Sequence, residues 1–274
     1  MSDETVLITG CSSGIGRATA EAFLDSDWVV YATARDTDDI TDLAERGCET
    51  ARLDVTDDED VARVVDSIEE DTGRIDCLVN NAGYSQNGPL EDIPVERLHA
   101  QFDVNVYGPH RLTRAVLPLM REQEEGTIVN VSSIYGTVSS PGAGAYAGSK
   151  FALEAMSDAL RSELDPFDID VVLVQPGPVT TEFNDRLSKK LDELDRTADY
   201  EWLYEAIEDV NTVSSSAPVA SEPEDVATII HDAAHLSNPK TRYPVGPLGK
   251  LIVYSRFLPD GVRDTVYRFV RKVT

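Results

Sequence analysis

A tyrosine and a lysine stand four residues apart in the stretch 144-GAYAGSK-150. Tyr146 and Lys150 precede an amphipathic run, so a helix here would bring both side chains to one face. An ammonium group close to a phenol favours the phenolate, and Lys150 could therefore lower the pKa of Tyr146 from its usual value of about 10. A tyrosine tuned in this way can exchange a proton with a substrate oxygen. The pair alone also fits two unrelated side chains on a helix, so its meaning depends on the residues around it.

A glycine-rich loop, 9-TGCSSGIG-16, directly follows a short apolar strand and opens a helix. Gly10 allows a tight turn, Gly14 lets the backbone approach a pyrophosphate, and Gly16 permits close helix–strand packing. The N-terminus of the helix would offer free N–H groups and the positive end of its dipole to a phosphate. An ordinary tight turn is the alternative, but the order of strand, loop and helix favours a dinucleotide site. The other loop residues included in that site are Ser12, Ser13 and Ile15.

Short apolar strands alternate with amphipathic helices through the first 176 residues. This alternation predicts a parallel sheet covered on both faces, and right-handed crossovers make it a doubly wound, Rossmann-type α/β fold. No Pro/Gly/Ser-rich linker and no repeat interrupts the chain, so a single domain is expected over residues 1–274. The strands are expected at 5–9, 28–33, 49–53, 75–80, 126–133 and 169–176, and the helices at 15–27, 38–47, 57–73, 94–120 (bent near Gly108) and 145–165.

The pattern changes after residue 176. A polar region at about 182–220 is expected to form the substrate loop, and the chain closes with a C-terminal helical extension at about 247–274. That extension consists of two apolar and aromatic segments divided at 259–261. The other elements expected here are helices at 187–196, 200–210 and 224–236, a loop at 211–223 and a strand at 241–246.

The spacing G-x-x-x-G-x-G, with a threonine at its head, resembles the glycine loop of the short-chain dehydrogenase/reductase superfamily, in its single-domain branch. Further landmarks of that family follow in order over about residues 5–181. The stretch 242-RYPVG-246 and the long C-terminal end are similar to hydroxysteroid- and retinol-type members. The resemblance implies an NAD(P)-dependent oxidoreductase. Its landmarks are Asp54 after the third strand, 80-NNAG-83 after the fourth, Asn105, Ser133 after the fifth, the Tyr146–Lys150 pair and 176-PGPVTT-181.

By this resemblance, four residues carry the chemistry. Tyr146 is the general acid and base, and Lys150 tunes it and hydrogen-bonds the nicotinamide ribose. Ser133 hydrogen-bonds the substrate oxygen and steadies its developing charge. Asn105 corresponds to the residue whose backbone carbonyl holds a water that links Lys150 to solvent, although an asparagine at a helix bend would also fit.

The end of the second expected strand, 29-VVYATAR-35, bears on the choice of cofactor. A carboxylate there hydrogen-bonds the ribose 2′-hydroxyl of NAD, whereas an arginine pairs with the 2′-phosphate of NADP. Ala34 occupies the position of that acid in NAD-preferring relatives and Arg35 follows it, so NADP(H) is favoured over NAD(H). Asp36 is expected to cap the next helix, and Ser13 stands where some NADP-preferring relatives carry a second basic residue. The remaining cofactor residues, by resemblance, are Asp54, Val55, Asn80, Ala82, Gly83, Tyr146, Lys150, Pro176, Gly177, Val179 and Thr181.

The chain is strongly acidic, with 50 Asp and Glu against 24 Lys and Arg and a net charge of −26. This charge disfavours binding to nucleic acids or anionic membranes, because phosphate groups need basic patches. Acidic residues scattered along a chain of normal hydrophobic content are similar to proteins of salt-loving archaea, in which salt screens self-repulsion. The N-terminus lacks the pattern of a signal peptide, and no run of about 20 apolar residues could span a bilayer. A cytoplasmic protein that works at high salt is therefore expected.

Three further patterns favour packing over chemistry. The stretch 231-HDAAH-235 is similar to the zinc-protease helix HExxH, but its aspartate is one methylene short and no third ligand is evident, so no metal site is predicted. The C-terminal segment is locally basic and could lie on a membrane; a cover for the substrate pocket or a subunit contact is the favoured interpretation. Cys11, Cys48 and Cys77 show no CxxC spacing and are expected to be buried and reduced.

The sequence thus predicts an NADP(H)-dependent oxidoreductase that interconverts a secondary alcohol and a ketone or aldehyde. Tyr84, Tyr135 and Phe183 near the expected mouth indicate an apolar substrate. An NAD-dependent sugar or polyol dehydrogenase is the alternative among enzymes, and a non-catalytic cofactor sensor is the alternative outside them, which the presence of the Tyr, Lys and Ser disfavours. Relatives pair through the helices that correspond to 94–120 and 145–165, so a homodimer or homotetramer is expected.

Overall fold

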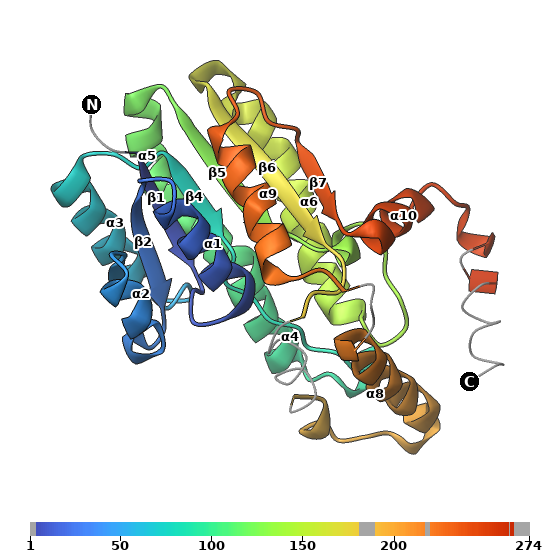
Figure 1. Cartoon of the computed structure of the whole chain (residues 1–274). Coiled ribbons are helices and arrows are strands. Elements are labelled where there is room, and N and C mark those ends of the chain that lie inside the picture. The colour runs from blue at the N-terminus through green and yellow to red at the C-terminus, as the bar shows by residue number, and fades with distance from the viewer. Residues whose placement is uncertain (1–3, 181–189, 217–219, 263, 266–274) are drawn as a thin grey trace.

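A seven-stranded parallel sheet forms the centre of the structure, a computed structural model that describes residues 4–180, 190–216, 220–262 and 264–265. Its strands are β1 (Thr5–Thr9), β2 (Val29–Ala34), β3 (Glu49–Arg52), β4 (Cys77–Asn80), β5 (Gly126–Val131), β6 (Ile169–Pro176) and β7 (Arg242–Val245). They pair in the order β3-β2-β1-β4-β5-β6-β7, and every pairing is parallel (Figure 1). The order runs outwards in both directions from β1 and β4, so the switch point at which open α/β sheets bind ligands lies at the carboxyl ends of these two strands. The predicted doubly wound α/β fold is confirmed.

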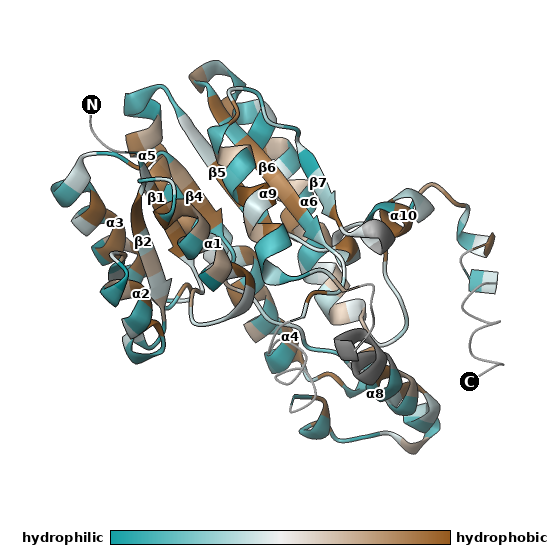
Figure 2. Ribbon diagram, viewed as in Figure 1, coloured by the Kyte–Doolittle hydropathy of each residue, from teal (hydrophilic) through white to brown (hydrophobic). Residues whose placement is uncertain are grey.

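Helices cover both faces of the sheet (Figure 1). They are α1 (Gly14–Leu24), α2 (Thr41–Glu45), α3 (Asp58–Thr72), α5 (Gly108–Gln123), α6 (Gly144–Leu164) and α9 (Pro223–His235). Along β1, Val6 and Ile8 pack under α1, α2 and α9, whereas Leu7 packs under α3, α5 and α6 on the other face. The inner strands β1, β4, β5 and β6 are almost wholly buried, because helices cover both of their faces, whereas the edge strands β3 and β7 are partly exposed. Figure 2 shows brown along β4 and β6, and teal on β7 and on much of the helices. All three cysteines are buried, as predicted.

The two histidines of 231-HDAAH-235 lie on α9 and pack against α1 and the residues that follow it. The Ser26 hydroxyl oxygen and His231 Nε2 lie 2.7 Å apart, and the indole nitrogen of Trp28 donates to His235 Nε2 at 2.9 Å. The Phe23 ring meets the His231 ring edge-on, with centroids 5.1 Å apart. These contacts tie α9 to the first helix, which confirms the packing role predicted for both histidines.

The long helix predicted at 94–120 is not regular. It begins as α4 (Val95–Phe102), passes through a π-helical stretch at Asp103–Tyr107 and continues as α5 to Gln123. The irregular stretch ends directly before Gly108, next to the predicted bend. Such π-helical turns are frequent at functional sites because they shift the backbone hydrogen bonds, and this one contains Asn105.

Two other predicted segments differ from the structure. The expected helix at 38–47 divides into a 3₁₀ turn (Thr37–Ile40) and the short α2. The prediction of a loop at 211–223 was wrong for residues 211–216, which belong to α8 (Glu201–Ser216). This part of the helix is polar, so the sequence shows no apolar periodicity that would predict it. In the helix expected at 187–196, residues 190–192 are helical, and 187–189 lie outside the described part of the chain. The prediction was wrong for 193–196, which form a turn and an irregular stretch.

The chain returns to the sheet with β7 and continues as α10 (Pro247–Ser255). This helix starts against the end of β6, since a side chain at Gly249 would meet Ile134 and the Gly177 backbone. Leu251 and Tyr254 are each 69% exposed, so the C-terminal extension carries apolar side chains on its surface. None of the helices in the described ranges is long and apolar enough to cross a membrane.

Candidate active site

The glycine loop crosses the carboxyl end of β1 and leads into α1. Gly10 and Gly14 adopt positive φ angles of 75° and 57°, a region that favours glycine. Gly16 has no room for a side chain, because a Cβ atom would lie 2.3 Å from the Gly10 carbonyl oxygen. The loop is therefore a backbone cradle at a helix N-terminus, which suits a pyrophosphate. Of the other predicted loop residues, Ser12 lines a neighbouring cavity, Ser13 is the N-cap residue of α1, and Ile15 packs on the core.

Asn81 and Thr9 hold this cradle against the end of β4. The Asn81 side-chain amide donates to the carbonyl oxygens of Thr9 and Gly10, at 2.9 and 3.1 Å. The Thr9 hydroxyl in turn accepts from the N–H groups of Asn81 and Ala82, at 3.0 Å each. The sequence prediction included neither Thr9 nor Asn81. The available signal was the second asparagine of 80-NNAG-83, a polar side chain directly after a buried strand.

Tyr146, Lys150 and Ser133 meet at the carboxyl end of β5. Tyr146 and Lys150 lie in the first two turns of α6, and Ser133 follows β5. The side chains of Ser133 and Tyr146 are hydrogen-bonded, and the Ser133 oxygen also accepts from the Tyr135 N–H at 3.2 Å. Lys150 is 5% exposed, donates from Nζ to the Val131 carbonyl oxygen at 2.8 Å, and places Nζ 5.9 Å from the centre of the Tyr146 ring. The structure thus brings together the three side chains that the sequence selected.

The ionisation of Tyr146 runs opposite to the direction predicted from the spacing. Burial raises the pKa of Tyr146 to about 12, and the hydrogen bond with Ser133 opposes this rise only in part. Burial lowers the pKa of Lys150 to about 8, against the attraction of the Glu154 carboxylate one turn further along α6. The Lys150 ammonium group is held at the Val131 carbonyl, where it does not outweigh the burial of the phenol. In the protein alone, the phenol is therefore protonated at neutral pH.

Asn105 is fully buried in the π-helical stretch and connects two parts of the site. Its Oδ1 accepts from the Tyr84 N–H at 3.1 Å, and its Nδ2 donates to the Tyr84 carbonyl at 2.9 Å. The same Nδ2 donates to Ser149 Oγ at 3.0 Å, and that hydroxyl donates to the Tyr146 carbonyl at 2.7 Å. The Asn105 side chain therefore fixes the Tyr146 turn of α6 relative to the loop after β4. Ser149 was not predicted, because a serine inside a helix gives no signal of its own.

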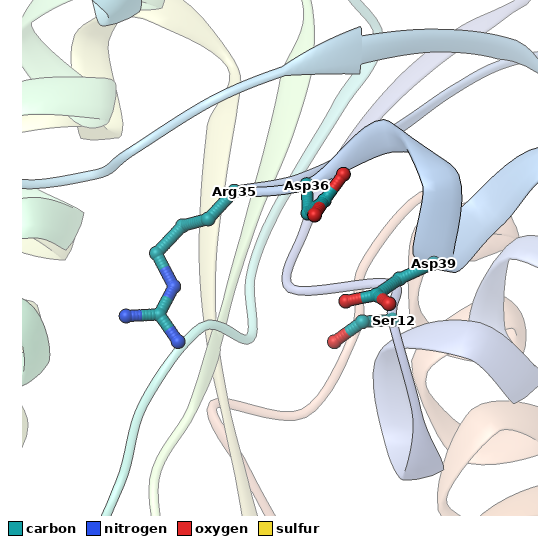
Figure 3. Close-up of a pocket in the computed structure, with 4 residues that line it drawn as sticks. All are labelled: Ser12, Arg35, Asp36 and Asp39. Atoms are coloured by element: carbon teal, nitrogen blue, oxygen red, sulfur yellow. The ribbon is translucent and has the colours of Figure 1, made fainter.

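A cavity of about 350 Å³ opens beside the end of β2, lined by Ser12, Arg35, Asp36 and Asp39. Figure 3 shows the Arg35 side chain extending away from Asp36 and Asp39. Asp36 accepts a hydrogen bond from the Asp38 N–H at 3.1 Å, which confirms its predicted capping role. The cavity adjoins the glycine loop through Ser12, so it suits the adenosine half of a dinucleotide whose pyrophosphate lies on the cradle.

Asp54 and Val55 shape the turn that follows β3. Asp54 Oδ1 accepts from the N–H and hydroxyl groups of Thr56, at 3.0 and 2.7 Å, and the Asp54 N–H donates to Asp60. Val55 is buried against Gly108 at the start of α5. These contacts explain the turn itself, and contact with an adenine ring stays a prediction for both residues.

Asn80, at the end of β4, turns its side chain into the sheet. Its amide donates to Asn130 Oδ1 at 2.9 Å, so it supports the central strands. We expect the backbone at Ala82 and Gly83 to come closer to a cofactor. A side chain at Gly83 would lie within 3.8 Å of Lys150 Nζ, so this glycine leaves space between the loop and the lysine.

The segment after β6 carries the last predicted cofactor residues. Gly177 packs closely, since a side chain there would lie 3.5 Å from the Val245 carbonyl oxygen. Val179 pairs with Ser221 across an isolated β-bridge. Pro176 ends β6, and Thr181 lies outside the described residues.

Of the aromatic side chains expected at the mouth of the site, Tyr135 lies beside Tyr146 and Tyr84 lies in the loop after β4. The Tyr135 ring meets the Tyr146 ring edge-on, with centroids 6.0 Å apart. The Lys190 ammonium group lies 4.1 Å from the centre of the Tyr84 ring, so a residue from the substrate-loop region reaches the loop after β4. Phe183 lies outside the described residues.

The chain matches the family described as short chain dehydrogenase over residues 4–192. Over 267 residues it is 37% identical to a protein of Escherichia coli strain K12 named uncharacterized oxidoreductase YbbO, covering 96% of this chain and 93% of the relative. Over 271 residues it is 33% identical to the 3-ketodihydrosphingosine reductase of Bacteroides thetaiotaomicron, covering 98% of each chain.

Solved structures show the same similarity. A short-chain dehydrogenase from Streptomyces avermitilis has a TM-score of 0.83 and 33% identity, covering 100% of this chain and 99% of its own. A short-chain dehydrogenase/reductase from Burkholderia phymatum, in complex with NAD, has a TM-score of 0.77 and 26% identity, covering 88% and 89%. The closed form of serine dehydrogenase, complexed with NADP+, has a TM-score of 0.78 and 28% identity, covering 89% and 95%. Structures similar to this one therefore hold either nicotinamide dinucleotide.

Gly16→Ala is expected to destabilise the protein by about 1–3 kcal/mol, the usual effect of overpacking. The added Cβ would collide with the Gly10 carbonyl oxygen and, at 2.4 Å, with the Asn81 amide nitrogen. Binding of a nicotinamide dinucleotide should weaken roughly tenfold, or by about 1.4 kcal/mol. Denaturant unfolding and a dinucleotide fluorescence titration measure the two effects.

Gly261→Ala is the matched control, because nothing in the described part of the chain lies within 4 Å of the added atom. It should leave both the unfolding midpoint and the affinity unchanged. If Gly16→Ala behaved like this control, the loop would not be the tight cradle described above.

Proposed function

We propose that this chain, which belongs to the short-chain dehydrogenase/reductase family, is an NADP(H)-dependent oxidoreductase that interconverts a secondary alcohol and a ketone. Family membership and the NAD(P)-dependent oxidoreductase class follow from the family match and from relatives similar over nearly the whole chain. One observation carries the rest of the proposal. The Tyr146 phenol, the Ser133 hydroxyl and the buried Lys150 ammonium group converge at the strand ends that also form the phosphate cradle.

Tyr146 is the proposed proton donor in ketone reduction. A bound nicotinamide supplies or accepts the hydride in this chemistry. As negative charge develops on the substrate oxygen, the O–H bond of Tyr146 breaks and a new O–H bond forms on the alcohol. Because the pKa of the phenol is raised to about 12, Tyr146 keeps its proton at neutral pH until that oxygen can take it. Ser133 is placed to donate a hydrogen bond to the same oxygen and so to stabilise its charge.

Lys150 is the proposed stabiliser of the phenolate that the transfer leaves behind. Its pKa of about 8 keeps it mostly protonated at neutral pH, although it is buried. Charges attract strongly in buried surroundings, so an ammonium group 5.9 Å from the ring favours the phenolate over the neutral phenol. Asn105 positions this pair through Ser149, and by the family resemblance its backbone carbonyl would hold the water that returns a proton.

The preference for NADP(H) rests on the end of β2. Ala34 brings no carboxylate to the position that would face a 2′-phosphate, and Arg35 lines the cavity beside the glycine loop. The nearby Asp36 is committed to capping the next turn. Asp36 and Asp39 line the same cavity, but the Arg35 side chain extends away from both and pairs with neither, which supports recognition of the phosphate over the hydroxyl (Figure 3).

An apolar substrate is supported by the Tyr135 ring beside Tyr146 and by the similarity to a protein named 3-ketodihydrosphingosine reductase. A homo-oligomer that pairs through α5 and α6 is supported by apolar side chains on that side of the molecule. Tyr107, Phe151 and Met156 are 41%, 43% and 39% exposed there. The net charge of −26 supports a protein that works at high salt, so its activity should be assayed at high salt.

Tyr146→Phe is expected to lower kcat roughly 10²- to 10⁴-fold, the usual effect of losing a general acid. Its affinity for NADPH should stay within about twofold, since the phenyl ring is retained. Turnover is measured by reduced-nicotinamide absorbance with a panel of ketones at high salt. Tyr31→Phe is the control, because it removes a hydroxyl that bonds Asp71 at 3.2 Å on the α3 side of the sheet. Tyr146→Phe turnover close to that of this control would refute the acid/base role.

The pH dependence of the initial rates should differ between the two directions. Ketone reduction needs the protonated phenol, whose pKa is raised to about 12, so its rate should stay level from about pH 6 to 8. Alcohol oxidation needs the phenolate, so its rate should rise with pH through the same range. Initial-rate measurements of ketone reduction and of alcohol oxidation across this pH range test the prediction. An oxidation rate that falls as pH rises from 6 to 8 would contradict the assignment.

Ala34→Asp is expected to invert the cofactor preference. The new carboxylate would repel a 2′-phosphate and accept a hydrogen bond from a 2′-hydroxyl. Ala34→Asn is the isosteric neutral control, which separates the effect of charge from the effect of size at this buried position. The measurement is the ratio of NADPH to NADH dissociation constants. A ratio that Ala34→Asp and Ala34→Asn change equally would show that charge at this position does not set the preference.

A further inference from the structure

We propose that Lys190 is a second cation for the 2′-phosphate of NADP(H), acting together with Arg35. The inference rests on the proposed NADP(H) preference and adds a residue from the substrate-loop region, outside the motifs that the sequence identified. It supplies the positive charge that Ser13 does not provide in the glycine loop.

Lys190 is held in place by its neighbours. Arg97 donates from Nη1 to the Lys190 carbonyl oxygen at 3.4 Å and pairs with Glu193 at 3.1 Å. Leu191 and Leu194, which follow Lys190, are buried in a small apolar cluster under α8. The backbone of this segment is thus tied to α4 on one side and to the core on the other, which fixes where the Lys190 side chain starts.

The Lys190 ammonium group lies close enough to Arg35 for the two positive charges to repel each other. It lies over the Tyr84 ring, in the loop after β4, whereas Arg35 directly follows β2. β2 and β4 flank β1 in the sheet. Neighbouring strands lie about 4.8 Å apart, so the ends of β2 and β4 are separated by roughly 10 Å. The Arg35 side chain starts at one of these ends and the Lys190 ammonium group lies near the other, so one phosphate between them can contact both cations.

Arg35 and Lys190 have carboxylates in their surroundings but are not paired with them: Asp36 and Asp39 line the cavity beside Arg35, and Glu193 lies near Lys190. Within the described ranges, neither Arg35 nor Lys190 forms an ion pair with a carboxylate, whereas Arg17, Arg52 and Arg111 all do. The positive charges of Arg97 and Arg35 add to burial in lowering the pKa of Lys190, and Glu193 opposes them. A dianion placed between Arg35 and Lys190 would remove this repulsion. Lysine is a common phosphate ligand that acts as a point charge.

A contact of this kind discriminates between the two dinucleotides. NADP(H) carries a phosphate where NAD(H) carries a hydroxyl, and the two are otherwise alike. Loss of the Lys190 charge should therefore weaken ligands with a 2′-phosphate and leave the others nearly unaffected. A contact to the pyrophosphate, in contrast, would weaken both dinucleotides equally.

The test is calorimetric titration of Lys190→Gln at one fixed salt concentration, with NADPH, NADH, adenosine 2′,5′-bisphosphate and 5′-AMP. The variant is expected to bind NADPH and the bisphosphate roughly tenfold more weakly. Its affinity for NADH and 5′-AMP should change less than about twofold. Arg35→Gln and the double variant complete a cycle, in which cations that share one phosphate should give non-additive losses.

Two controls separate the contact from other effects. Lys240→Gln removes the same charge from an exposed lysine before β7 and should bind all four ligands as the wild type does. Lys190→Arg keeps the charge and should retain most of the affinity for NADPH. Equal losses for all four ligands in Lys190→Gln, or no loss for any, would overturn the inference. Wild-type protein that binds NADH as tightly as NADPH would overturn the NADP(H) preference itself, which is a distinct failure.

Discussion

The site depends on the hydrogen bonds that join the ends of β1 and β4. The side-chain amide of Asn81 donates to the carbonyl oxygens of Thr9 and Gly10, and Gly16 lies so close to this contact that any side chain would break it. These hydrogen bonds fix the position of the glycine loop relative to the loop that follows β4. That loop is in turn bonded to Asn105, which holds the first turn of α6 through Ser149. Cofactor position and acid/base position are therefore fixed by one connected set of hydrogen bonds.

Burial determines the resting state of the acid/base pair. It penalises charge on both groups, so the pKa of Tyr146 rises while that of Lys150 falls. In the proposed mechanism, charge appears on Tyr146 only when a substrate oxygen takes its proton, and the Lys150 ammonium group then stabilises the phenolate in surroundings that screen little. A phenol that is protonated at rest suits the reductive direction. In the oxidative direction the tyrosine must first lose its proton, and Lys150 is the group in the described site that favours that loss.

Much of the fold and the site could be predicted from the sequence, because local pattern and topology determine them. Alternating strands and helices give a parallel sheet, and a parallel sheet brings Gly10, Ser133 and Gly177 to one edge without further information. The pKa of Tyr146 could not be predicted, since spacing shows that two residues share a helix face and says nothing of burial. The roles of Asn81 and Lys190 could not be predicted for another reason. Their roles depend on contacts with segments 70 or more residues away. Lys190 lies in no recognised motif, and Asn81 lies in 80-NNAG-83, a motif that does not reveal which residues its side chain contacts.

Because the chain is strongly acidic, the cationic side chains that touch a dinucleotide are especially important for its binding. A dinucleotide is itself an anion, and a protein of net charge −26 repels it at long range. Salt shortens this repulsion to about 3 Å at 1 M, whereas partly buried pairs in contact are screened much less. Recognition at high ionic strength must then come from groups that touch the ligand. The cradle supplies backbone N–H groups for the shared pyrophosphate. Under the proposed NADP(H) preference, discrimination between the dinucleotides depends on the few cations that can touch a 2′-phosphate, so the placement of Arg35 and Lys190 would matter more than the overall charge of the protein.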